Sequence, residues 1–326
     1  MSRIDVHHHF IPESYILAYN AAGGDPSGWI LPPWSPESSI ELMKSHQIGT
    51  AILSVTAPGP TVLQGNPTAA VELCVNINNY AAALCRQYPG IFGFFATLPP
   101  LTDENLDDTI HEAVRSLETL KADGVTLYTS YGGNYLGYPG FQPLWAELDR
   151  RGAVVFVHPT HSSDTKLVNP ALPQPVIDYP HETTRTAVDL IISGTVRSHP
   201  RTKIILSHAG GTLPYLAARA AHLTADAGLT HLDATEFLDQ ARSFYFDLAL
   251  SSNPLTLDLI LQFAKPGHVL YGSDFPYAPT KTICTNDRML EEYAGMDDQI
   301  RHSVVRGAAT QLFPRLSNTE AVGKRS

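Results

Sequence analysis

Basic side chains and cysteines are both scarce in this chain of 326 residues. Its 22 lysines and arginines are outnumbered by 32 aspartates and glutamates, which gives a formal net charge of −10. This deficit argues against nucleic acid as a partner, because nucleic-acid-binding domains carry basic patches. The three cysteines are odd in number and widely spaced, which argues against a disulfide framework and suits a reducing, cytoplasmic compartment. No apolar run approaches the length of about eighteen residues that a membrane-spanning helix needs, so no membrane association is expected.

Eight short runs rich in β-branched and aromatic residues recur along the chain. Runs such as "AVVFVHP" and "TKIILSHAG" are almost continuously apolar, which is typical of parallel strands buried on both faces. The predicted strands are residues 3–7, 50–56, 92–98, 125–130, 154–158, 203–208, 243–249 and 268–273.

Amphipathic, helix-like segments lie between most of these strands. The predicted helices are residues 36–46, 67–88, 103–121, 141–151, 182–198, 213–223 and 254–263. Eight strands alternating with helices predict a (β/α)8 TIM barrel. An open doubly wound sheet is the alternative, but it more often has a glycine-rich phosphate turn after its first strand, where this chain has "HHHFIPE".

Two long connections interrupt the regular alternation. Residues 10–34 form an insertion after the first strand, and residues 160–180 form a long loop after the fifth. Loops that follow barrel strands lie over the carboxyl-terminal face, so both are expected to wall the active site. We expect residues 1–316 to form one domain and residues 317–326 to form a loose tail.

Polar side chains gather at the carboxyl-terminal ends of the predicted strands. His7 and His9 end the first strand, His158 the fifth, His208 the sixth and Asp274 the eighth. These ends converge on one mouth of a barrel, where imidazoles and a carboxylate suit zinc or a similar divalent ion. Because side chains alternate along a strand, His7 and His9 share a face and His8, between them, is expected to be a packing or surface residue.

The number of metal ions is predicted from the fourth strand, which reads "GVTLYTSYGG". It has no lysine near its end that could bridge two ions, and Lys121 precedes it. One divalent ion is therefore expected, with zinc favoured and manganese as the alternative. We expect no organic cofactor, since no dinucleotide-binding motif is present.

Four strand-end motifs together resemble the amidohydrolase superfamily, in its branch of metal-dependent non-oxidative decarboxylases. They are "IDVHHHFIP", "FVHPT", "LSHAGG" and "YGSDFPY". The resemblance implies that a metal is held by His7, His9, His158 and Asp274. It implies an acid/base role for His208, and a homodimer in which Arg219 reaches a substrate carboxylate across the interface.

The resemblance also implies a substrate class. Where a relative has a second substrate-binding arginine, this chain reads "WILPPWSPE", with Leu31 at the matching position. Loss of that cation argues against a second acidic group on the substrate. A pocket edged by Trp29, Leu31 and Trp34 would suit an apolar aromatic ring.

Within that branch, the sequence looks most like the 6-methylsalicylate decarboxylases of polyketide metabolism. The expected reaction is loss of CO2 from 6-methylsalicylate to give 3-methylphenol. Asp274, His208 or a metal-bound water could deliver the proton to the ring. The alternative is a metal-dependent hydrolase of a lactone or amide, because a fold does not fix the reaction.

Overall fold

Eight parallel strands form the centre of the molecule. The computed structural model describes residues 2–318 except 64, 103 and 162–163. The strands follow one another around the sheet in chain order, and each neighbouring pair is parallel. They are β1 Arg3–His9, β2 Ile48–Ser54, β3 Phe92–Thr97, β4 Gly124–Tyr128, β7 Val154–His158, β8 Lys203–Leu206, β9 Tyr245–Asp247 and β10 Val269–Leu270.

The segment that begins with β10 returns to β1. The amide of Val6 donates to the carbonyl of Tyr271 (3.0 Å), and the amide of Asp274 donates to the carbonyl of His7 (2.8 Å). A parallel bridge joins His8 to Phe275. These contacts bring the last strand segment against the first, and the (β/α)8 barrel prediction is confirmed. The remaining two strands, β5 Ser130–Tyr131 and β6 Asn134–Tyr135, form a small separate hairpin.

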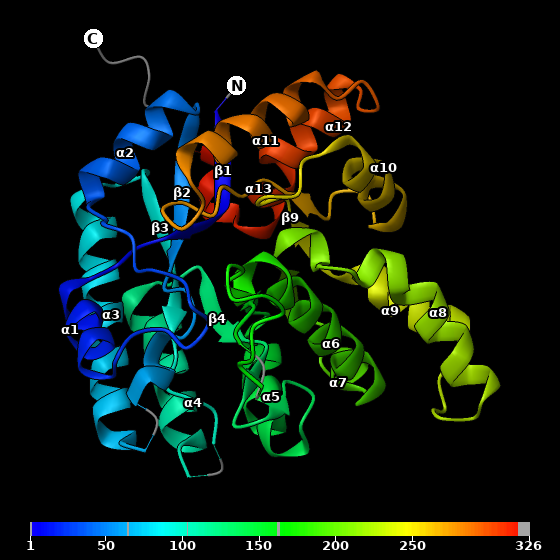
Figure 1. Cartoon of the computed structure of the whole chain (residues 1–326), viewed down its shortest axis with the longest axis horizontal. Coiled ribbons are helices and arrows are strands. Elements are labelled where there is room, and N and C mark those ends of the chain that lie inside the picture. Colours follow the sequence, from blue (N-terminus) through cyan, green and yellow to red (C-terminus); the bar gives the residue numbers. More distant parts are fainter. Residues whose placement is uncertain (1, 64, 103, 162–163, 319–326) are drawn as a thin grey trace.

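Helices surround the strands, and α8 with α9 extends away from the barrel at the right of Figure 1. No helix in the described part of the chain combines the length and hydrophobicity that crossing a bilayer requires. The helices are α1 Glu13–Ala21, α2 Pro36–Ser45, α3 Pro67–Gln87, α4 Leu106–Arg115, α5 Gln142–Arg151, α6 Asp178–Ile192, α7 Thr195–Ser198, α8 Leu213–Asp226, α9 Ala234–Ser243, α10 Pro254–Phe263, α11 Thr280–Glu292, α12 Asp298–His302 and α13 Ala308–Leu312.

The seven predicted helices are present, with two internal differences. The segment predicted as 103–121 is α4 followed by a π-helical turn, Ser116–Leu120, and its residue 103 lies outside the described residues. The segment predicted as 182–198 begins earlier and is divided at Gly194, whose φ of 77° is unfavourable for other residues, into α6 and α7.

Aromatic rings form a column through the barrel below the strand ends. The ring of Phe156 lies 5.0 Å from that of His7 and stacks on Phe95 at 5.3 Å. Phe95 in turn lies 5.9 Å from Phe313, just beyond α13. This apolar column gives His7 a rigid floor, because packed interiors leave side chains little freedom.

The two long connections meet over the barrel. The insertion at residues 10–34 contains α1, and the loop at 160–180 contains a short 3-10 turn, Gln174–Val176. The amide of Gln174 donates to the carbonyl of Ser27 (3.0 Å), which joins them. The single domain at 1–316 stays a prediction. The predicted tail begins within the 3-10 turn Pro314–Asn318, and its residues 319–326 lie outside the described residues.

Candidate metal centre and active site

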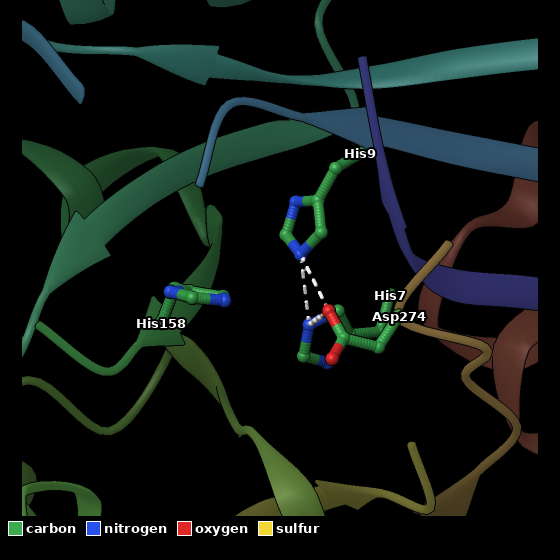
Figure 2. Close-up of side chains that lie close together, drawn as sticks. All are labelled: His7, His9, His158 and Asp274. Atoms are coloured by element: carbon green, nitrogen blue, oxygen red, sulfur yellow. Dashed lines mark hydrogen bonds and ion pairs between the residues drawn. The ribbon is translucent and has the colours of Figure 1, made fainter. Parts of the chain in front are cut away.

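Four of the predicted strand-end residues converge on one point. One ligand atom from each of His7, His9, His158 and Asp274 lies within 4.8 Å of the other three. Figure 2 shows the three rings and the carboxylate directed toward a common space. They come from β1, the end of β7 and the turn after β10, so the barrel brings together residues that are far apart in sequence.

Hydrogen bonds fix the orientation of the three rings. A ring nitrogen beside a carbonyl or carboxylate oxygen must carry the hydrogen, so each Nδ1 is a donor and each Nε2 is left to bind a cation. The Nδ1 atoms of His7, His9 and His158 contact Asp247 Oδ2 (3.0 Å), the Ser54 carbonyl (3.2 Å) and the Pro159 carbonyl (2.8 Å), respectively.

The spacing of the donor atoms fits one small divalent cation. The Nε2 atoms of His7 and His9 are 3.0 Å apart, and they lie 3.3 and 3.1 Å from Oδ1 of Asp274. Ligands placed about 2.0–2.2 Å from a tetrahedral zinc are separated by similar distances. Nitrogen and carboxylate donors in these numbers therefore match a site for one divalent cation.

Burial sets the protonation of the cluster. Burial lowers the pKa of His9, and it lowers that of His158 well below the usual range, so both rings are neutral. Burial raises the pKa of Asp274, but hydrogen bonds from His7 and His9 outweigh it and hold the pKa well below its usual range. Burial lowers the pKa of His7, yet Asp247 and Asp274 raise it to about 10 overall. A cation bound at Nε2 of His7 must displace that proton, because a metal ligand is deprotonated.

His208 and Asp247 extend the cluster. The ring of His208 lies 4.8 Å from that of His7, and its Nδ1 donates to the carbonyl of Ala249 (2.9 Å). Asp247 is fully buried; besides the His7 ring, its carboxylate accepts the amides of His208 (3.2 Å) and Ala249 (2.9 Å). One carboxylate thus positions both a candidate ligand and the backbone of the nearby histidine.

The backbone around the site is strained. His208, Leu250 and Asp274 have φ values of 55°, 55° and 61°, in the left-handed region that residues other than glycine rarely adopt. Such conformations persist only where the surrounding structure enforces them, and they concentrate at functional sites. These three residues lie in the turns that follow β8, β9 and β10, beside the cluster.

A cavity of about 530 Å³ opens onto the cluster. None of the described residues that line it is a lysine or arginine. Its walls combine apolar and aromatic side chains with a few polar groups, which is typical of a site for a small organic ligand. They include Trp29, Val176, Tyr179 and Tyr277, together with Asp25, Thr56, His158, His208 and Asp274.

The predicted substrate-binding residues are placed differently from one another. Trp29 lines the cavity. Leu31 and Trp34 instead pack against the core, where Nε1 of Trp34 donates to Oγ of Ser39 (2.8 Å). Arg219 is exposed on α8. The substrate-binding roles of all four residues stay predictions.

His8 belongs to a structural network on the other side of β1. Its ring is buried between Oδ2 of Asp5 (3.0 Å) and Oγ of Ser39 (2.9 Å), so it packs inside the protein and does not lie on the surface. The Asp5 carboxylate also accepts the amides of His7 and Ser273 (both 3.1 Å). This network supports two of the three chain segments that carry the candidate ligands, β1 and the segment after β10.

Asp247 was not among the site residues predicted from the sequence. It ends β9 as a polar residue after an apolar run, which is the same signal that identified the residues on the other strands. Tyr179 and Tyr277 were also missed, and they give weaker signals because tyrosine is common in cores. Their place in the cavity depends on tertiary packing.

The chain is similar to proteins of known family and name. The chain matches the amidohydrolase family over residues 4–315. It is 57% identical to decarboxylase yanB of Aspergillus niger, over 97% of this chain and 88% of that protein. It is 51% identical to 6-methylsalicylic acid decarboxylase acuB of Aspergillus aculeatus, over 98% of each chain.

A solved structure shares the fold. It is dihydroxybenzoic acid decarboxylase from Polaromonas sp. JS666, with bound manganese and the inhibitor 2-nitroresorcinol. It is 22% identical and superposes with a TM-score of 0.80, covering 99% of each chain. The family match over residues 4–315 includes the positions of all four strand-end motifs of this chain. This chain therefore belongs to the amidohydrolase family.

Proposed function

We propose that this protein is a carbon–carbon lyase that removes CO2 from a salicylate-type aromatic acid in a metal-dependent, non-oxidative reaction. The best candidate substrate is 6-methylsalicylate, which gives 3-methylphenol and CO2. The observation that carries the proposal is the 51% identity, over 98% of each chain, to a protein named for that activity. The convergence of three histidines and an aspartate beside a cavity whose described lining residues include no lysine or arginine supports it.

One divalent cation would be held by His7, His9, His158 and Asp274. We propose zinc, because three imidazoles and one carboxylate match its preferred donors, with manganese as the alternative. When bound, the cation supplies Lewis-acid stabilisation of negative charge on the substrate oxygens. We expect no organic cofactor.

The cavity suits an apolar ring with a single carboxylate. No lysine or arginine among the described lining residues would neutralise a second acidic group, and Asp25 would repel one. Trp29, Val176 and Tyr277 provide apolar surface that fits a methylated ring. Leu31 and Trp34 would support this wall from behind, since both pack against the core.

The difficult step is protonation of the ring carbon that carries the carboxylate, because it interrupts aromaticity. The proton forms a C–H bond there, the bond to the carboxylate then breaks, and its electron pair restores the ring as CO2 leaves. Asp274 and His208 both line the cavity and are the candidate donors. The low pKa of Asp274 favours its anionic form, so it would have to gain the proton when substrate binds.

We propose a homodimer formed through α8. Tyr215, Arg219 and Leu223 are four residues apart, so they share one face of this projecting helix. The exposed fractions of Tyr215 (77%) and Leu223 (53%) are high for large apolar side chains. Arg219 would then reach toward the partner's cavity.

The scarcity of cysteine and the absence of a disulfide among the described residues agree with a cytoplasmic location.

A substrate panel tests the proposed reaction. Metal-loaded protein is incubated with 6-methylsalicylate and other hydroxybenzoates, and CO2 and the phenolic products are quantified. We expect 3-methylphenol and CO2 in equal amounts, with a His158→Ala variant as the inactive control. Release of neither product from any acid in the panel would sink the decarboxylase proposal. Sedimentation of Tyr215→Ser/Leu223→Ser tests the dimer separately.

A further inference from the structure

A second cavity lies at the opposite end of the barrel. It also has a volume of about 530 Å³, and we call it the basal cavity. Lys203 opens β8, Tyr245 opens β9 and His268 precedes β10, and all three line it. The metal cluster lies at the carboxyl-terminal ends of the strands, so the two cavities are separated by the length of the barrel. The basal cavity plays no part in the proposed decarboxylation.

Three cations line the basal cavity: Arg197, Lys203 and Lys265. None of them forms a side-chain ion pair or hydrogen bond with another described residue. Neighbouring Arg201, by contrast, is paired with Asp149 at 3.3 Å. Burial lowers the pKa of His268, and the charges of Lys265 and Lys203 lower it further, so the two lysines lie close to one ring. Such a group of like charges favours an anion between them.

Helix α9 contributes acidic and amide side chains to the lining of the basal cavity. Glu236 and Asp239 line the basal cavity there, beside Gln240. The buried Oε1 atom of Gln240 has no hydrogen-bond partner among the described residues, nor has the buried Oγ1 of Thr202. Because buried polar atoms nearly always have a hydrogen-bond partner, a ligand or a water is expected to supply one for each of these two atoms. The oxygen atoms of Glu236, Asp239 and Gln240 on α9 are acceptors, and they favour a ligand with a hydrogen-bond donor.

Apolar and aromatic surface completes the basal cavity. Phe244, Ile204 and Val196 contribute to its lining. The rings of Tyr245 and His268 are stacked 4.0 Å apart at an angle of 5°, which makes them a rigid flat wall. An inorganic ion would leave this surface unused, whereas an organic molecule would cover it.

We propose that the basal cavity is a second binding site, for a small organic anion that also carries a hydrogen-bond donor. The anionic group lies against Lys203 and Lys265, and the donor lies against α9. The shared chemistry is that of a carboxylate or a phosphate monoester attached to an apolar group. The site is independent of the metal centre and of the proposed decarboxylation.

Calorimetric titration of the metal-loaded full chain tests this site. The probes are inorganic phosphate, benzoate, phenyl phosphate and tyrosine O-phosphate, the last of which adds an ammonium donor. The test variant is Lys203→Gln/Lys265→Gln, and the matched control is Lys44→Gln/Arg86→Gln, which removes two exposed cations elsewhere. Binding that persists unchanged in the test variant belongs to the metal centre.

We expect the test variant to weaken at least one organic probe by about tenfold or more, because each lost cation removes a charge-assisted hydrogen bond. The control should bind like the wild type. Gln240→Leu should weaken tyrosine O-phosphate more than phenyl phosphate. Arg197→Gln, on an exposed helix, gives a second reading if the double variant fails to fold. Equal isotherms in all variants, or tighter binding of inorganic phosphate than of every organic probe, would overturn the proposal.

Discussion

Asp274 and Asp287 are buried to a similar extent, but their carboxylates have different polar partners. Asp287 contacts Nη1 of Arg3 (2.5 Å), Nδ1 of His46 (2.6 Å) and the hydroxyl of Tyr271 (2.9 Å). Its negative charge is balanced by a cation of the chain itself. Among the described residues, the Asp274 carboxylate contacts the imidazoles of His7 and His9 and no lysine or arginine, and the Nε2 atoms of both rings converge on it.

The difference separates a structural network from a candidate metal site. A buried charge is costly unless it is paired, and the Asp287 network supplies its own partner. The Asp274 cluster has several donors of electron pairs and, among the described residues, no lysine or arginine, so a divalent cation would complete it. Convergence of Nε2 atoms, more than the number of histidines, is the informative feature.

The largest effect is expected from Asp274→Asn. The amide is nearly the same size, but it loses the negative charge and binds protons and cations poorly. We expect some metal to be retained and kcat to fall by about 10²–10⁴, the range for loss of an acid/base group. Metal content and turnover of 6-methylsalicylate are measured on the same sample. Near-normal turnover would remove Asp274 from the chemistry.

Asp287→Asn should affect stability and spare metal binding. Removing one partner of a buried ion pair leaves Arg3 only partly compensated, by Glu291. We expect the free energy of unfolding to fall by about 3–5 kcal/mol. Denaturant unfolding measures the loss, and metal affinity of the folded variant should match that of the wild type. Loss of metal with unchanged stability would contradict the comparison.

Asp247→Asn tests whether the carboxylate behind His7 positions this ligand. We expect metal affinity to weaken about 10–100-fold, as is typical when the partner of a ligand is lost. Competition with a chelator measures this affinity without using activity. Glu112→Gln, a change at a buried carboxylate paired with Arg115, serves as the control and should leave metal affinity unchanged.

The smallest effect is expected from Glu147→Gln, which breaks the ion pairs of a partly exposed carboxylate with Arg150 and Arg151. Hydrogen bonds and charge from Arg150 and Arg151 lower the pKa of Glu147 from 4.5 to about 2. A lowered pKa means that the stabilisation is present above pH 4.5 and is lost as the pH falls toward 2. The variant should be less stable by about 0.2–1 kcal/mol at pH 6. This difference should shrink at pH 3; a growing difference would have the wrong sign.

The sequence predicted the architecture well where apolar runs were continuous. All eight barrel strands lie where such runs were found, because strands buried on both faces must be apolar. Helices α1, α9, α11, α12 and α13 were missed. Helix α11 has no side-chain cap and begins after Pro279, so local signals are weak and packing decides its formation.

The convergence of the four candidate ligands could be predicted from the sequence, whereas their surroundings could be predicted less well. His7, His9, His158 and Asp274 were identifiable because each interrupts or ends an apolar strand. The wall of the cavity could not be derived in the same way. Leu31 and Trp34 differ from Trp29 only in how the insertion folds, which depends on contacts with distant segments such as Gln174.

The contact between the first and last strands has a consequence for the order of events during synthesis. His9 and Asp274 are 265 residues apart and meet only when the segment after β10 docks beside β1. A growing chain holds histidines from its earliest residues but lacks the fourth donor until most of the barrel exists. Tight binding of a cation would therefore require a closed barrel. The bound cation would in turn stabilise the contact between β1 and the segment after β10.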